Sequence, residues 1–219
     1  MLEIGCGTGK ASYPLAQRGC RLVCVELGER LAEIARLNLA DFPLVDVITT
    51  SFETWEPPAV DFDMVFAASA WHWLDPTTRY GNAARLLKPG GLLALVTGSH
   101  AFPKGFDPFF TEIQSCYEAI GKGLRKWPPP APDEIPDERQ AIESSGLFED
   151  VRVRRYLWAI DYTADSYLDL LSTYSDHIAM NKSKRDILYA DIRRRISARP
   201  SGLIRKHYLS ILHIARLGR

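Results

Sequence analysis

A glycine-rich segment near the start of the chain carries the strongest chemical signal. Residues 3–9 read Glu-Ile-Gly-Cys-Gly-Thr-Gly, an order that predicts a buried strand, a tight turn and then a helix. Glycine takes positive φ angles and lacks a Cβ, so such a loop can close around a ligand while its amides and the helix N-terminus face polar groups. Glu3, Gly5, Cys6, Gly7 and Gly9 are therefore candidate binding residues. A glycine turn that binds nothing is the plain structural alternative.

Glu26 is the second candidate, because it follows the run Arg21 to Val25 where a second parallel strand is expected to stop. A carboxylate at that position could accept both hydroxyls of a ribose. Folds that bind nicotinamide dinucleotides place an acid at the same position, so Glu26 alone does not identify the ligand. The spacing of the glycines has to distinguish the possible cofactors. Their fingerprint is G-x-G-x-x-G, with the pyrophosphate on the helix. Here the third glycine comes one residue early and an acid precedes the first.

This spacing resembles the first motif of the class I S-adenosylmethionine-dependent methyltransferases, acid-x-G-x-G-x-G. The resemblance implies S-adenosylmethionine as the cofactor, with Glu3 facing its cationic methionine end and Glu26 its ribose. It also implies contacts from Leu27 and Ala68. The backbone of Cys6, rather than its sulfur, is expected to touch the ligand.

The adenine ring is expected beside residues 50–53, after the third strand. Related sequences often carry Gly-Asp where this chain has Thr50 and Ser51, and that acid accepts the exocyclic amine. Ser51 departs from the pattern, which leaves the backbone of Phe52 to read the ring and places the affinity for the cofactor in doubt.

Strands and helices alternate after the glycine segment. Apolar runs predict strands at residues 45–49, 63–69, 92–96, 148–158 and 203–215. Apolar residues recur at helical spacing from Tyr80 to Leu87, and Pro89-Gly90 then marks a turn. This alternation predicts a parallel sheet with right-handed crossovers. Leu-Lys-Pro-Gly-Gly before a strand also resembles the methyltransferases, which implies an α/β fold with a doubly wound, mostly parallel seven-stranded Rossmann-like sheet and an antiparallel C-terminal edge hairpin.

The second half of the chain contains more predicted elements than the expected C-terminal hairpin requires. A helical stripe covers residues 109–120, Trp127 to Pro132 reads as a stiff extended segment, and a short helix at 139–144 ends at Gly146. Two further helices, at 165–173 and 184–198, separate the last two strands, although a hairpin loop takes only two to five residues. We expect one methyltransferase domain over residues 1–219. In it, residues 1–100 bind the cofactor, and helical cap insertions at 101–147 and 163–202 cover the substrate.

Several short segments narrow the resemblance to small-molecule methyltransferases of type 11, including trans-aconitate methyltransferase-like proteins. They are Trp71-His72-Trp73-Leu74, Tyr162-Thr163-Ala164 and residues 170–175. The implied function is methyl transfer to a small molecule at a carboxylate or hydroxyl oxygen.

Methyl transfer asks little of protein side chains, because aligning nucleophile, methyl and sulfur supplies most of the rate. His72 is the candidate general base, since it follows the carboxyl end of the fourth strand. The alternative is a histidine that bonds the backbone and shapes the pocket. Trp71 and Trp73 are candidate pocket walls, with core packing expected for at least one. Tyr174 and His177 could contact substrate or pack at a helix end.

The composition does not identify a partner, but it argues against some classes of protein and of partner. The 27 basic and 27 acidic residues give zero net charge, which argues against nucleic acid. No apolar run is long enough to span a bilayer and no signal peptide opens the chain, so we expect a cytoplasmic protein. The four cysteines lack metal-binding spacing, so no metal is expected.

Two features leave alternatives open. From residue 182 onward the chain is rich in Lys and Arg, which suits an anionic substrate, an RNA methyltransferase, or simply a solvated face balanced by acids. Met1 stands inside the expected first strand, whereas family members carry an N-terminal helix before it. Uncovered apolar surface would then favour a homodimer, an open cofactor site or an inactive relative that acts by association.

Overall fold

A parallel sheet forms the first part of the molecule. The computed structural model describes residues 1–57, 62–122, 127 and 129–218. Its parallel strands are β1 (Leu2–Ile4), β2 (Leu22–Glu26), β3 (Val45–Thr49), β4 (Phe62–Ala68) and β5 (Leu87–Ala101). In register, Ile4 lies beside Val25, and Glu26 beside Thr49. The carboxyl ends of β1, β2 and β3 therefore lie along one edge of the sheet, where open α/β folds bind ligands.

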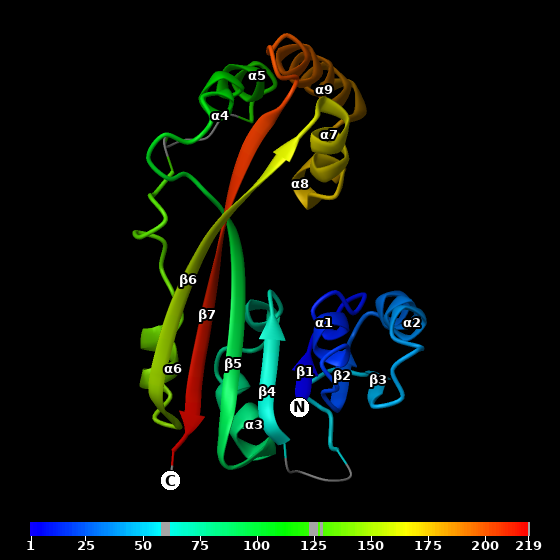
Figure 1. Cartoon of the computed structure of the whole chain (residues 1–219), viewed down its shortest axis with the longest axis vertical. Coiled ribbons are helices and arrows are strands. Elements are labelled where there is room, and N and C mark those ends of the chain that lie inside the picture. The colour runs from blue at the N-terminus through cyan, green and yellow to red at the C-terminus, as the bar shows by residue number, and fades with distance from the viewer. Residues whose placement is uncertain (58–61, 123–126, 128, 219) are drawn as a thin grey trace. The chain divides into compact units, whose positions relative to one another are not determined.

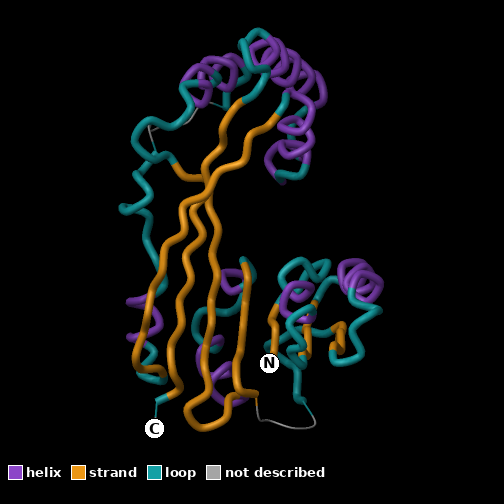
Figure 2. The backbone as a smooth tube through the Cα atoms, in the orientation of Figure 1, coloured by secondary structure: helices purple, strands orange, loops and turns teal. Residues whose placement is uncertain are grey.

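Two long strands complete a seven-stranded sheet of order β3-β2-β1-β4-β5-β7-β6. They are β6 (Phe148–Tyr162) and β7 (Ile204–Leu217), and β7 runs opposite to β6 (Figure 1). The tube in Figure 2 shows β5, β6 and β7 as long continuous strands. The predicted fold class, with its antiparallel C-terminal pair, is confirmed.

The turn expected at Pro89-Gly90 lies inside β5 instead. Leu87 pairs with Phe62 and Leu92 pairs with Met64, so the residues between Leu87 and Leu92 lie opposite the single residue Asp63. Gly90 has φ +73°, a conformation that side chains disfavour. Pairing on both sides of this bulge makes the strand longer than the predicted 92–96.

The chain divides into two compact units, each with its own core. The first unit comprises residues 1–98, 136–155 and 210–219. Its helical elements are α1 (Ser12–Ala16), α2 (Glu29–Asn38), the 3₁₀ turn η1 (Trp71–Trp73), α3 (Arg79–Leu86) and α6 (Arg139–Ser144). Leu2, Ile4 and Val65 are fully or almost fully buried in its main core, because strands of a parallel sheet are covered on both faces.

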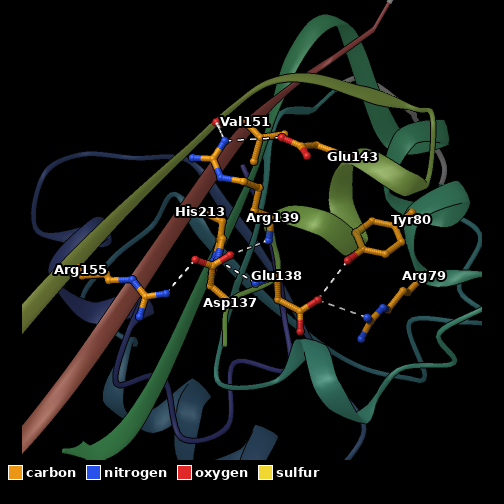
Figure 3. Close-up of polar contacts among 9 residues, drawn as sticks. All are labelled: Arg79, Tyr80, Asp137, Glu138, Arg139, Glu143, Val151, Arg155 and His213. Carbon is orange, nitrogen blue, oxygen red and sulfur yellow. Dashed lines mark hydrogen bonds and ion pairs between the residues drawn. The ribbon is translucent and has the colours of Figure 1, made fainter. Parts of the chain in front are cut away.

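A polar network fixes α6 within this first unit (Figure 3). Glu138, just before α6, accepts hydrogen bonds from Arg79 (3.4 Å) and Tyr80 (3.2 Å) on α3. Its backbone N–H donates to Nε2 of the buried His213 on β7 (3.0 Å). Since that nitrogen accepts, the imidazole is neutral, and burial lowers its pKa. The network ties a segment far along the sequence to the sheet.

The second unit comprises residues 99–135 and 156–209. Its helices are α4 (Phe109–Glu112), α5 (Gln114–Ala119), α7 (Ala164–Ser172), α8 (Ser175–Ile178) and α9 (Lys182–Ser197). Thr163 and Ser166 form a capping box that starts α7. The predicted helices at 165–173 and 184–198 thus form within a residue or two of their expected positions, and α8 is an addition. The predicted extended segment at 127–132 includes Pro128, which lies outside the described residues.

Both cap insertions expected from the sequence overlap the second unit, except that residues 136–147 belong to the first. Whether the chain acts as one methyltransferase domain stays a prediction. Among the helices of the described residues, none is long and apolar enough to cross a membrane.

Candidate functional site

The glycine loop after β1 adopts the backbone that its sequence predicts. Gly5, Gly7 and Gly9 all have positive φ angles, of 65°, 57° and 83°. A Cβ on Gly5 would lie 2.5 Å from the Cβ of Ala70, so only glycine fits there. A Cβ on Gly7 would meet nothing within 4 Å. Gly5 is therefore required by packing, whereas Gly7 keeps open space in front of the loop.

Glu26 is held at the end of β2 by the loops on either side of it. Its Oε2 accepts a hydrogen bond from the Gly7 backbone N–H and its Oε1 accepts one from the Gly28 N–H, both at 2.8 Å. The side chain is only 8% exposed. A carboxylate offers about four acceptor positions, so two remain for hydroxyl donors. The arrangement presents a fixed carboxylate beside the glycine loop.

These residues border a cavity of about 350 Å³ in the first unit. Its lining consists of Ile4, Gly5, Gly7, Val25, Glu26, Leu27, Leu31, Thr50, Ser51, Phe52, Glu53, Ser69, Ala70, Trp73 and Leu74. Leu27, Leu31 and Trp73 are 74%, 43% and 81% exposed although they are large and apolar. Exposed apolar side chains around a polar centre are typical of a ligand site.

Glu53 lies in this lining, two residues after the position where related sequences carry an acid. It accepts a hydrogen bond from the Ser51 hydroxyl at 2.5 Å, and its own N–H donates back to that hydroxyl at 3.3 Å. The side chain of Phe52 between them is 4% exposed. The loop therefore presents a carboxylate after all, from a residue that was not singled out in the sequence.

The predicted cofactor residues fall into two groups. The cavity lining includes Gly5, Gly7, Glu26, Leu27, Ser51 and Phe52 but not Glu3, Cys6, Gly9 or Ala68. Glu3 is 1% exposed and its carboxyl contacts Cys24 Sγ at 3.8 Å. Burial raises the pKa of this carboxyl. Its expected role toward the methionine end remains a prediction.

The aromatic segment after β4 separates into a core residue and a cavity residue. Trp71 is buried and packs edge-on against Tyr80, whereas Trp73 lines the cavity. His72 is exposed, its ring 4.8 Å from that of Trp73, and it is not part of the lining. Ser69, which begins this segment, has φ +57° and does line the cavity. The catalytic role of His72 stays a prediction.

A second cavity, of about 230 Å³, lies within the second unit. Its lining consists of His100, Phe102, Phe110, Ile113, Gln114, Tyr117, Lys122, Trp127, Tyr167, Leu171, Tyr174, Asp176, His177, Met180 and Lys206. Tyr174 and His177, the two residues that the sequence proposed for substrate contact, are both among them. Tyr117 Oη lies 3.3 Å from His177 Nε2.

Lys206 is one of the polar residues of this cavity that the sequence interpretation missed. It was counted with the basic C-terminal face, yet its side chain is only 2% exposed. Burial lowers its pKa to about 7. The alternation of side chains along a strand could have indicated its burial. Lys206 is two residues after Ile204, and both are buried on β7.

The rest of the basic C-terminal segment is largely paired with acids of the second unit. Arg193 pairs with Asp165, Arg194 and Arg195 with Asp191, Arg199 with Asp107, and Arg205 with Asp161. These pairs offset much of the positive charge, so the interpretation as a solvated face balanced by acids agrees with the structure better than a nucleic-acid surface.

The strand order and the glycine-loop site together define a class I methyltransferase fold. Residues 2–95 match the family model described as a methyltransferase domain. The first part of the chain is therefore similar in sequence to methyltransferase domains, and the chain has the fold of such proteins.

Two known methyltransferases are also similar to the chain in sequence. The chain is 37% identical over 98 residues to an uncharacterized methyltransferase of Mycobacterium tuberculosis, a match that covers 44% of this chain and 38% of that protein. It is 30% identical over 150 residues to the ubiquinone biosynthesis O-methyltransferase of Cereibacter sphaeroides, covering 67% of this chain and 59% of the relative. It thus spans less than two thirds of either relative.

The fold also resembles that of a solved protein, a proposed type II methyltransferase from Anaeromyxobacter dehalogenans. The TM-score is 0.69 at 22% identity, and the match covers 98% of this chain and 88% of the other. At that identity the likeness concerns the fold alone. The trans-aconitate methyltransferase-like subgroup is not singled out by these matches and stays an expectation.

Proposed function

We propose that the protein transfers a methyl group from S-adenosylmethionine to an oxygen of a small molecule. The observation that carries the proposal is the carboxylate of Glu26, fixed between the Gly7 and Gly28 amides at the mouth of the glycine loop. The family match over residues 2–95 supports the same assignment. The oxygen acceptor is supported by the name of the Cereibacter sphaeroides relative, an O-methyltransferase.

The residues of the first cavity fit this cofactor. Glu26 has free acceptor positions for the two ribose hydroxyls. The open space before Gly7 admits the close approach of a ligand to the backbone. Leu27 supplies exposed apolar surface for the adenine, and the Glu53 carboxylate can accept a hydrogen bond from its exocyclic amine. A volume of about 350 Å³ lies within the usual range for small-molecule sites.

When bound, S-adenosylmethionine supplies an electrophilic methyl group on a sulfonium. The chain itself has to hold an acceptor oxygen in line with that methyl and exclude water, which can provide most of the rate. Trp73 lines the cavity with its face largely exposed, and an aromatic face there stabilises positive charge. A base is needed only where the acceptor must lose a proton.

Calorimetric titration with S-adenosylmethionine and S-adenosylhomocysteine tests the cofactor site directly. Wild type binds both, and Glu26→Ala weakens binding by roughly 10- to 100-fold, since hydrogen bonds to a charged group contribute about 1.5–3 kcal/mol. Glu29→Ala removes the same charge from an exposed position in the first turn of α2 and outside the cavity. It therefore serves as the control and retains wild-type affinity. Equal affinities of all three proteins would refute the placement of the cofactor.

His72 is proposed as the general base for an acceptor that must be deprotonated. His72→Ala then slows methyl transfer by about 100-fold or more, the usual contribution of a positioned base, and leaves the affinity for S-adenosylhomocysteine unchanged. Transfer is measured as S-adenosylhomocysteine release with an acceptor found by a metabolite screen. Unchanged turnover would remove His72 from the mechanism, in keeping with its place outside the cavity lining.

Two other functions remain as outcomes of these measurements. An inactive relative that acts by association would bind neither cofactor form. An RNA methyltransferase would bind RNA with an affinity that falls steeply with salt, although the ion pairs on the basic segment do not favour it.

A further inference from the structure

We propose that the cavity of the second unit is a binding site for a planar aromatic carboxylate, whose charged group pairs with Lys206. Its lining residues come from the parts of β5 and β7 that belong to the second unit, from α4, α5, α7 and α8, and from the loops beside them, so all of them lie in that one unit. Taking this ligand to be the methyl acceptor rests on the function proposed above. Binding itself does not depend on it.

The amine of Lys206 borders this cavity without a hydrogen-bond or ion-pair partner among the described residues. Among the residues that the structure describes, no hydrogen bond or ion pair reaches Lys206 Nζ, which lies over the face of Tyr208, 4.5 Å from the ring centroid. The side chain is 2% exposed. An ammonium buried without a counter-ion is costly, and proteins rarely retain one unless something pairs with it. An anionic ligand supplies the missing partner.

Two further buried nitrogens point to a polar ligand. His100 Nε2 and His177 Nδ1 are buried without a hydrogen-bond partner in the described part of the chain, and both residues line the cavity. Buried polar atoms are normally satisfied, so these can serve the carboxylate oxygens or a second polar group. Burial lowers the pKa of both histidines, that of His100 to about 3. They are therefore neutral at pH 7 and able to donate one hydrogen bond each.

The apolar part of the lining favours a ligand with a flat aromatic ring. Phe102, Phe110, Tyr117, Trp127, Tyr167 and Tyr174 supply aromatic walls, and aromatic pairs add attraction beyond the area that they bury. A volume of about 230 Å³ exceeds the roughly 150 Å³ of an apolar cavity that holds benzene. The space suits a bicyclic ring that bears a carboxylate. The charged residues Lys122 and Asp176 also line the cavity but are exposed and oppose each other in sign.

The probe is 2-naphthoate, titrated calorimetrically against its neutral isostere 2-naphthamide and the aliphatic anion octanoate. We expect 2-naphthoate to bind at least about 10-fold more tightly than 2-naphthamide, because a charge-assisted bond to a buried amine is lost with the amide. Lys206→Met keeps the length and apolar body of the side chain and abolishes that difference. Lys104→Met, which removes an exposed amine of the same unit outside the lining, preserves it.

Proton uptake identifies the amine as the partner. At pH 8 the free Lys206 is mostly neutral because its pKa is about 7, so binding an anion should draw close to one proton onto it. Titration in two buffers of different ionisation enthalpy measures this uptake. The other titratable or charged groups near Lys206 or in the lining are His100, His207, Tyr208, Tyr117, Lys122, Tyr167, Tyr174, Asp176 and His177. Burial keeps the phenols of Tyr117, Tyr167, Tyr174 and Tyr208 protonated at pH 8 by raising their pKa values. Lys206→Met should take up no proton.

The outcomes separate this inference from the proposed function. Failure of 2-naphthoate to bind, equal binding of the amide or octanoate, or an unchanged Lys206→Met would overturn it even if S-adenosylhomocysteine binds normally. The protein could instead bind 2-naphthoate with the expected dependence on Lys206 but fail to bind S-adenosylhomocysteine. That result would sustain the inference and refute the proposed methyl transfer.

Discussion

The cavities of the two units are built by different means. In the first unit the polar contacts come from backbone amides and a carboxylate that those amides hold in place. In the second, they come from side chains on strands and short helices that are far apart in sequence, including an amine among aromatic rings for which the described residues offer no ion-pair partner. A site made by backbone tolerates little change in the loop itself. A site made by side chains can change its ligand by single substitutions, which suits the substrate-binding role proposed for it.

The largest effect is expected for a side chain at Gly7. Gly7→Val fills the space in front of the loop and should reduce S-adenosylhomocysteine affinity by at least about 100-fold, because the ligand loses its close approach to the backbone. Binding of 2-naphthoate in the second unit should stay within about twofold of wild type, since the loop lies outside that cavity. Calorimetry with both ligands on one preparation measures the contrast.

Gly19→Val is the matched control for Gly7→Val. Gly19 also has a positive φ, of 75°, with nothing within 4 Å of the position that a Cβ would occupy, and it lies outside the cavity. Both variants impose the left-handed strain of about 1–2 kcal/mol, but only one obstructs the ligand. If Gly19→Val lost the cofactor equally, strain rather than obstruction would explain the result and the contrast between the sites would weaken.

Replacing Lys206 is expected to stabilise the fold while it destroys the second site. Replacing a buried ion pair by apolar side chains of similar size is often neutral or stabilising by about 1–4 kcal/mol. The same desolvation cost applies to a single buried amine, so Lys206→Met should raise the free energy of unfolding at pH 7 by an amount of that order. Urea unfolding of this variant and of Lys104→Met, which replaces an exposed amine and should change little, makes the comparison.

The same substitution should alter the pH dependence of stability. Burial lowers the pKa of Lys206 from 10.5 to about 7. Between these values the unfolded chain binds a proton that the folded chain has released, so stability due to this residue falls as pH drops from about 10.5 to about 7. The gain of Lys206→Met over wild type should therefore be largest at pH 7 and shrink toward pH 10. A gain that does not vary with pH would mean that Lys206 is not buried as a titrating amine.

This contrast also explains what could be predicted from the sequence. Gly5, Gly7 and Glu26 lie within a short stretch whose backbone needs are visible as residue types, and the strand periods on either side place them at one sheet edge. Lys206 and His100 are brought together only by the pairing of long strands, which no local pattern specifies. The inward period of β7 did mark Lys206, but it was outweighed by the many basic residues around it.

Glu53 is an intermediate case. The expected acid was absent at Ser51, and the loop instead turns a carboxylate two residues later into the same cavity. Under the proposed function, a hydrogen-bonded serine and glutamate take the place of one acid, which sequence comparison at a single position does not reveal.

The smallest effect is expected from neutralising that carboxylate. Glu53→Gln keeps the size of the side chain but removes the charge, so the affinity for S-adenosylhomocysteine should fall only about 3- to 10-fold, since an exposed hydrogen bond contributes about 0.5–1.5 kcal/mol. Glu56→Gln, on an exposed residue of the same loop outside the cavity, should have no effect.

The decisive ligand is S-inosylhomocysteine, whose ring carries an oxygen in place of the amine. Wild type should reject it because two acceptors would then face each other, and Glu53→Gln, which can donate from its amide, should bind it better than wild type does. If the variant discriminated against it as strongly as wild type, the adenine would be read by the Phe52 backbone alone, and the first site would be made by backbone at both of its ends.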